Sequence, residues 1–238
     1  MVRCALALCF LTLTLGWMVH LGTAQDPVGG DGPDWASLKK RFAGKLEIDK
    51  ATNRVNLTYS FINKSQLDDF TPQEGLRLQK GSITLPVGSV LRHKAVWDDV
   101  RIVTLILPTN PHGTLIQTTD KIELVLGKPT TTSNKVILQV LGKNLSQQAY
   151  KLKDTGKRPI AVDWQIDDQK SSVKFGTLQF GSVFPKVMNQ PKQVEFLAEK
   201  GEVQMGQLKL MGKLDTKWMA LESGSEATGP EKKTLKGK

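Results

Sequence analysis

Short segments in which apolar and polar residues alternate are the feature that most limits how this chain can fold. In VNLTYSF, residues 55–61, every second residue is apolar. Because successive side chains of a strand point to opposite faces, this pattern predicts a strand with one buried and one solvated face. Further strands are expected in residues 46–48, 76–85, 100–107, 121–127, 135–142, 149–153, 160–181 and 203–210.

The spacing of these segments predicts an all-β fold. Turn signals recur about every ten residues, which is typical of a sandwich or a barrel, and no internal repeat indicates a propeller or a solenoid. Residues 100–107, VRIVTLIL, are apolar on both faces and are expected to form a central, fully covered strand. The side chains change face at Gly176 and at Gly206, which predicts a β-bulge at each glycine.

The two ends of the chain differ in composition from this middle part. Residues 1–24 have a short basic start, an apolar run and small residues before Gln25, which indicates a secretory signal peptide. Residues 25–44 are expected to be a lead-in with a short helix, residues 45–221 the sandwich, and residues 222–238 a disordered polar tail. The expected location is therefore secreted or periplasmic, with no membrane span after the signal is cleaved.

Cysteine content and charge further limit which class of protein and which ligands are expected. Both cysteines, Cys4 and Cys9, lie in the expected signal peptide, so we expect no disulfide, thiol nucleophile or cysteine metal site in the mature protein. This favours a bacterial exported protein. The net charge is +10, and residues 128–158 are especially basic. Such a stretch keeps a protein soluble or attracts an anionic polymer, but it lacks the interleaved aromatic residues expected for single-stranded nucleic acid.

The last strands carry a pattern that resembles a known family. Residues 191–220 are similar to the closing strands of concanavalin A-like, or laminin G-like, jelly-roll domains of exported bacterial (planctomycete-type) proteins. Residues 55–70 resemble the opening strand of such domains, and the likeness covers residues 45–220. It implies a two-sheet antiparallel β-sandwich, but no single function, because lectins, adhesion modules and glycoside hydrolases share such folds. The matching residues are Val203, Leu208, Leu210, Gly212, Leu214, Asp215 and Trp218.

Catalytic and metal-binding signatures are missing from the sequence. The sequence has no E-x-D-x-x-E run, the arrangement that places the carboxylates of a jelly-roll glycosidase on one strand face, and Asp163 shares its face with Gln165 but with no second acid. We therefore predict no catalytic residues, no cofactor and no metal site. A calcium-binding loop at Asp68-Asp69 or at Asp167-Asp168 is the alternative, because calcium takes oxygen ligands from loops.

The segment SVLRHKAVWDDV, residues 89–100, looks most like an active site. It combines His93, Trp97 and the pair Asp98-Asp99. The apolar strand that follows instead indicates that the segment leads into a central strand. Arg92, His93 and Trp97 are kept as candidate ligand-binding residues at one end of a groove, whereas Trp164 and Tyr59 are expected in the core because their neighbours on the same face are apolar.

These observations favour an exported, non-catalytic binding module for a polysaccharide or another envelope component. Two alternatives stay open. One is a divergent glycan-cleaving hydrolase on the same scaffold, and the other is a structural envelope protein whose basic face associates with an anionic polymer. Two acids that converge in a groove would favour the hydrolase. The sequence gives neither the ligand nor the oligomeric state.

Overall fold

The computed structural model of the protein describes residues 33–107, 114–118, 121–129, 134–150, 159–167, 169–184, 190–199 and 201–223. The expected signal peptide, residues 151–158 of the basic stretch and most of the expected tail lie outside these residues. The described elements are α1 (Trp35–Arg41), β1 (Lys45–Asp49), β2 (Arg54–Tyr59), the 3-10 helix η1 (Lys64–Asp69), β3 (Phe70–Thr71), β4 (Arg77–Gln79), β5 (Ser82–Leu85), β6 (Val90–Leu107), β7 (Thr114–Thr118), β8 (Ile122–Pro129), β9 (Asn134–Val140), β10 (Lys143–Tyr150), β11 (Ile160–Ile166), β12 (Lys170–Phe175), β13 (Leu178–Val183), β14 (Lys192–Ala198), β15 (Val203–Leu214) and α2 (Thr216–Ser223).

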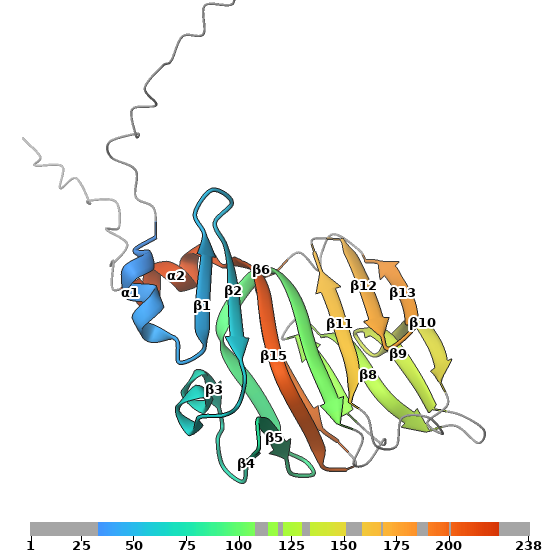
Figure 1. The fold of residues 1–238 in the computed structure, drawn as a ribbon. Coiled ribbons are helices and arrows are strands. Elements are labelled where there is room, and N and C mark those ends of the chain that lie inside the picture. The colour runs from blue at the N-terminus through green and yellow to red at the C-terminus, as the bar shows by residue number, and fades with distance from the viewer. Residues whose placement is uncertain are drawn as a thin grey trace, which may run out of the picture. The chain divides into compact units, whose positions relative to one another are not determined.

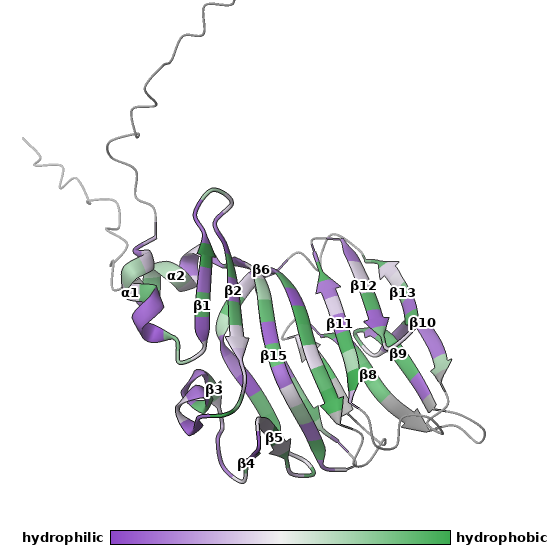
Figure 2. Cartoon of the chain, viewed as in Figure 1, coloured by the Kyte–Doolittle hydropathy of each residue, from purple (hydrophilic) through white to green (hydrophobic). Residues whose placement is uncertain are grey.

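The strands form two antiparallel sheets, as predicted (Figure 1). Sheet 1 has the order β1-β2-β15-β6-β11-β12-β13, and the β4–β5 hairpin pairs with the start of β15. Sheet 2 has the order β3-β6-β14-β7-β8-β9-β10. Apolar side chains of the two sheets share one core, and Figure 2 shows hydrophobic and hydrophilic residues alternating along the strands. The chain is thus an antiparallel two-sheet sandwich of the jelly-roll type, in agreement with the resemblance.

Strand β6 belongs to both sheets and connects them. Its first part pairs with β14 and β3, and its second part pairs with β15 and β11. The register against β15 skips Asp98, which makes this residue the extra one of a β-bulge. Before the bulge the odd-numbered residues are buried, and after it the even-numbered residues are buried. The segment 89–100 therefore forms part of the central strand, whereas the sequence had indicated that it only leads into this strand.

Two contacts accommodate this bulge. The ammonium group of the fully buried Lys192 donates to the carbonyl oxygens of Asp98 (3.0 Å) and Gln190 (2.9 Å), so the buried charge is hydrogen-bonded. On the other side, a Cβ atom on Gly212 would lie 2.1 Å from the Asp99 carbonyl oxygen, so only glycine lets β15 approach β6 here.

Several sequence predictions need correction. The strand at residues 100–107 is central, but Arg101 is exposed, so one of its faces is only partly covered. The change of face at Gly176 marks a two-residue hairpin turn between β12 and β13, because Phe175 pairs with Leu178. At Gly206 the register against β6 does shift, which confirms that bulge. Strand β10 begins at Lys143, earlier than expected.

The sequence also did not predict helix α2, which extends beyond the expected end of the sandwich to Ser223. Asp215 caps its first turn by accepting a hydrogen bond from the Trp218 amide at 2.7 Å. The predicted N-terminal helix is present as α1, and its Arg41 forms an ion pair with Glu222 of α2 at 2.9 Å. No helix in the described ranges has the length and hydropathy that a membrane crossing requires.

Candidate functional site

The predicted binding residues do not line one groove. His93 and Trp97 have no exposed surface, and both side chains lie in the core between the sheets. Arg92 lies on the opposite face of β6, where about half of its side chain is exposed. Strand alternation explains the separation, because residues one apart point to opposite faces. His93 and Trp97 therefore cannot touch a surface-bound ligand, whereas Arg92 can.

His93 belongs to a buried polar cluster with Tyr59 and Asp69. The Ala95 amide donates to His93 Nδ1 at 3.1 Å, so the ring hydrogen is assigned to Nε2, which donates to the Tyr59 hydroxyl at 2.8 Å. That hydroxyl in turn donates to Asp69 Oδ2 at 2.7 Å. Burial lowers the pKa of His93 to about 3, so the ring stays neutral at physiological pH.

Asp69 connects this cluster to the segment before β1. Its Oδ2 accepts hydrogen bonds from the amides of Ala43 (2.9 Å) and Gly44 (3.0 Å), and its Oδ1 pairs with the ammonium group of Lys94 at 2.6 Å. Burial by itself would raise the pKa of Asp69, but these donors and the Tyr59 hydroxyl hold it below its usual value. The carboxylate is thus committed to protein donors, which argues against the alternative of a calcium-binding loop at Asp68-Asp69.

A calcium site needs several oxygen ligands gathered in one place. Within the described ranges, no three or more histidine, cysteine, aspartate or glutamate side chains gather as metal ligands would. Asp168 of the second predicted loop lies outside the described residues. Asp167 accepts a hydrogen bond from the Lys170 amide at 2.9 Å, which is the ordinary role of a turn aspartate.

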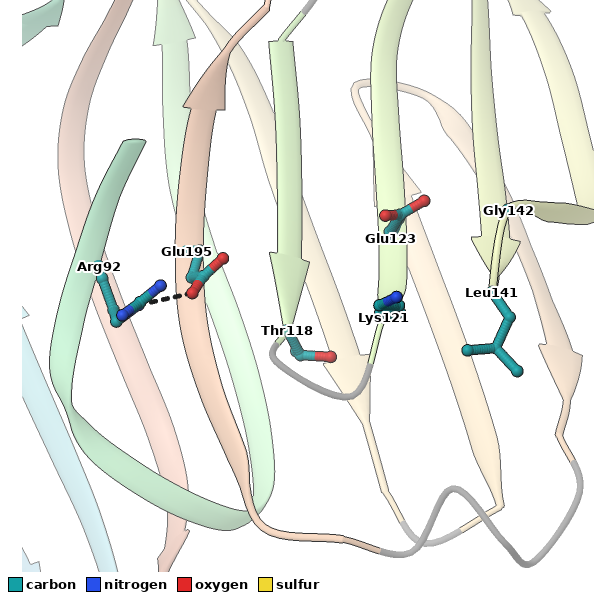
Figure 3. A pocket seen from close by; sticks show the side chains of 7 residues that line it. All are labelled: Arg92, Thr118, Lys121, Glu123, Leu141, Gly142 and Glu195. Atoms are coloured by element: carbon teal, nitrogen blue, oxygen red, sulfur yellow. Dashed lines mark hydrogen bonds and ion pairs between the residues drawn. The ribbon is translucent and has the colours of Figure 1, made fainter. Parts of the chain in front are cut away.

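The exposed face of Arg92 borders a hollow on the outer face of sheet 2, which we call the sheet-2 hollow. Its volume is about 590 Å³. Arg92 Nε donates to Glu195 Oε1 at 2.6 Å, and Figure 3 shows this pair on one side of β7 and Glu123 on the other. The lining residues are Arg92, Thr118, Lys121, Glu123, Leu141, Gly142 and Glu195.

The register of sheet 2 aligns residues of neighbouring strands in a row across this face. Arg92 pairs with Glu195, Glu195 with Gln117, and Gln117 with Glu123. The row continues through Gln139 to Asn144, whose side chains share a 2.6 Å hydrogen bond. Sequence reasoning missed Glu195 and Glu123 because the search required two acids on one strand, whereas here the acids lie on β14 and β8.

Charges within the sheet-2 hollow are balanced, since Arg92 and Lys121 face Glu123 and Glu195. Burial raises the pKa of Glu123, Lys121 opposes this shift, and Glu199 adds to it. Glu195 is nearly buried and is paired with Arg92. The two carboxyl groups therefore sit in different environments, and no aromatic side chain is found among the described residues that line the hollow.

Comparisons with known proteins give structural similarity only. No protein-family model matches the chain, and no curated protein matches it in sequence. It is similar to the metal-free carbohydrate recognition domain of Emp46p, with 11% identity and a TM-score of 0.48 over 64% of this chain and 93% of that one. It is also similar to a Bacillus licheniformis β-glucanase, with 10% identity and a TM-score of 0.47 over 65% of this chain and 97% of that one.

A further similar structure is the Bacteroides ovatus protein "Xyloglucan PUL GH43B", with 8% identity and a TM-score of 0.48. The match covers 64% of this chain but only 38% of the other, so this chain spans well under half of that protein.

Proposed function

We propose that the protein is an exported module that binds an uncharged polysaccharide in the sheet-2 hollow. The observation that carries the proposal is the row of hydrogen-bonding residues from adjacent strands, which meets the hollow at Arg92, Glu195 and Glu123. Carboxylate and guanidinium groups form strong, directional hydrogen bonds, and sugar hydroxyls both donate and accept them. Adjacent strands lie about 4.8 Å apart, so such a row suits an extended ligand that crosses the strands.

The balance of charge favours an uncharged ligand over an anionic envelope polymer. Arg92 already neutralises Glu195, and Lys121 lies beside Glu123, so the described lining of the hollow has no net positive charge. The overall charge of +10 would attract anionic polymers to the surface as a whole, but that attraction is screened by salt. Binding in the sheet-2 hollow is therefore expected to persist at a salt concentration that removes charge attraction.

Arg92→Met is expected to weaken polysaccharide binding at least tenfold. The change removes a hydrogen-bonding group from the hollow and takes the arginine partner from a nearly buried Glu195 carboxylate. A hydrogen bond to a charged group contributes about 1.5–3 kcal/mol, and 1.4 kcal/mol corresponds to tenfold in affinity. The measurement is a glycan array followed by calorimetric titration, at about 0.15 M and 0.5 M salt.

The matched control is Arg101→Met. Arg101 forms the same kind of cross-strand pair with Asp163 (2.7 and 2.8 Å), its side chain is equally exposed, and it lies on sheet 1. It should bind as the wild type does. Absence of binding to every glycan, or equal binding by the Arg92→Met and Arg101→Met variants, would reject the proposal.

The positions of Glu123 and Glu195 favour hydrolysis as a second candidate function. Strand β7 separates β8 from β14, so the two Cα atoms are about 10 Å apart. Inverting glycosidases hold their carboxyl groups about 6.5–9.5 Å apart, a separation that glutamate side chains on Cα atoms at this spacing can reach. Glu123, whose pKa is raised by burial, would protonate the leaving oxygen as the glycosidic bond breaks. Glu195 would take a proton from the water whose oxygen bonds to the anomeric carbon.

Glu123→Gln separates binding from cleavage. If the protein is a hydrolase, it should release new reducing ends from the polysaccharide that it binds, and the Glu123→Gln variant should lose at least 100-fold of that activity because the general acid is gone. Chromatography of the digest and a reducing-end assay provide the readout. A wild-type protein that binds but releases no product would exclude hydrolysis and leave the binding function intact.

A further inference from the structure

Two residues at the rim of the sheet-2 hollow have an unusual backbone conformation. Lys121 precedes β8 and has a φ of 63°, and Leu141 follows β9 and has a φ of 50°. The Leu141 amide donates to the Lys121 carbonyl oxygen at 3.0 Å, so the two left-handed residues support each other. Figure 3 shows both side chains beside Glu123 on the same side of the hollow.

A leucine at position 141 lowers the stability of the folded protein. Leu141-Gly142 is a two-residue hairpin turn, since Val140 pairs with Lys143, and such turns favour asparagine, aspartate or glycine at the first position. At the turn between β1 and β2 the chain does use an asparagine, Asn53, with a φ of 53°. A branched side chain in the left-handed region carries a steric penalty that asparagine largely avoids.

Packing does not compensate for this penalty at Leu141. Phe61 is also left-handed, with a φ of 52°, but its side chain is fully buried, so its contacts in the core offset the cost. Leu141 is 60% exposed and lies outside the core. Residues in strained backbone conformations cluster at active sites and ligand-binding sites. Leu141 combines this strain with an exposed apolar side chain at the rim of the sheet-2 hollow, and this combination indicates a role in recognition there.

We propose that Leu141 and Lys121 determine which glycan the sheet-2 hollow accepts, by selecting a polysaccharide that carries methyl-bearing substituents such as O-acetyl esters. This inference rests on the proposed binding function. The Leu141 side chain would pack against the methyl group, and the Lys121 ammonium group would donate to the ester carbonyl or to a neighbouring hydroxyl. Both partners on the ligand are uncharged, as the charge balance of the hollow requires.

The chemistry of the lining explains this choice of substituent. Among the described residues of the lining, Leu141 is apolar and the others are polar, charged or glycine. The flat face of a sugar ring is usually recognised by an aromatic ring, and the described part of the lining has none. A single branched aliphatic side chain has too little flat surface for that purpose, but it can remove one methyl group from water. Each buried carbon of this kind contributes about fourfold in affinity.

The first test replaces Leu141 with asparagine. Leu141→Asn should raise the melting temperature by about 2 °C, because asparagine tolerates the left-handed conformation. It should also weaken binding to the acetylated glycan about fivefold, because the apolar contact is lost. The control is Lys80→Asn, in the equivalent Lys80-Gly81 turn between β4 and β5, where φ is 47°. That variant should gain similar stability without a change in binding.

The second test compares acetylated xylan with the same xylan after alkaline deacetylation. The wild type should bind the acetylated form at least fourfold more tightly. The Leu141→Asn variant should bind the two forms equally.

These outcomes separate the two proposals. If the protein binds glycans in an Arg92-dependent manner but does not distinguish the two xylans, or if Leu141→Asn binds the acetylated xylan as the wild type does, the selectivity inference is wrong and the binding function stands. If no glycan binds at all, both proposals are wrong. A stability gain in Leu141→Asn without a loss of binding would assign the leucine no role in recognition.

Discussion

Asp69→Ala is expected to lower the free energy of unfolding by about 3–5 kcal/mol, because removal of one partner from a buried charge pair leaves the others unsatisfied. Asp69 is fully buried and accepts hydrogen bonds from Tyr59, Ala43 and Gly44, and it pairs with Lys94. Without the carboxylate, two backbone amides and a phenol would lose their acceptor inside the protein. Urea denaturation of the variant and the wild type measures the difference.

Asp163→Ala is the matched control for this prediction. Asp163 also forms an ion pair between strands, but its partner Arg101 is about half exposed, and such surface pairs contribute at most about 1 kcal/mol. Tyr59→Phe should have an intermediate effect of about 1–3 kcal/mol, because it removes one hydroxyl from the chain of hydrogen bonds and leaves His93 without its acceptor. If Asp69→Ala costs no more than Asp163→Ala, the cluster does not stabilise the fold.

The pH dependence of stability gives a second readout of the same cluster. The pKa of Asp69 is lower in the folded protein than in the unfolded chain, so the folded state binds fewer protons than the unfolded state at acidic pH. Its stabilising contribution is therefore complete above about pH 4 and is lost as the pH falls further. The wild type should lose stability more steeply below pH 4 than the Asp69→Ala variant, whose position 69 no longer titrates.

Most of the strands could be predicted from the sequence because each is encoded locally, although β7 and the first half of β6 were not predicted. Alternation in residues 55–61 and 160–166 identified β2 and β11, and their apolar members, Tyr59 and Trp164 among them, are buried as expected. Positions where the apolar residues switch from one face of a strand to the other were harder to interpret from the sequence. A hairpin turn at Gly176 and a bulge at Gly206 both invert the side-chain pattern, and only the pairing partner distinguishes them.

The sheet-2 hollow could not be predicted because its residues come together only through pairing between distant segments. Arg92 and Glu195 are 103 positions apart, and their contact depends on the register between β6 and β14. The bulge at Asp98 likewise decides which residues of β6 face the core. Arg92 was nevertheless identified from its segment, whereas its neighbours His93 and Trp97 were assigned to the same groove although they point to the opposite face.

Trp97→Ala is expected to lower the free energy of unfolding by about 3–5 kcal/mol, as is usual for removal of a large buried aromatic side chain. Trp97 is fully buried at the point where β6 leaves sheet 2, and its ring lies 6.3 Å from that of His93. Trp97→Phe should cost less, partly because the indole N–H has no hydrogen-bond partner among the described residues and its loss carries no penalty.

Glycan affinity should distinguish this packing role from ligand binding. Because Trp97 does not line the sheet-2 hollow, the folded fraction of the Trp97→Phe variant should bind with wild-type affinity, whereas Arg92→Met should not. The comparison is made by calorimetric titration. It is carried out at a temperature at which thermal denaturation shows that both variants are folded. A Trp97→Phe variant that is fully folded and yet binds tenfold more weakly would show that the tryptophan contributes to the site despite its burial.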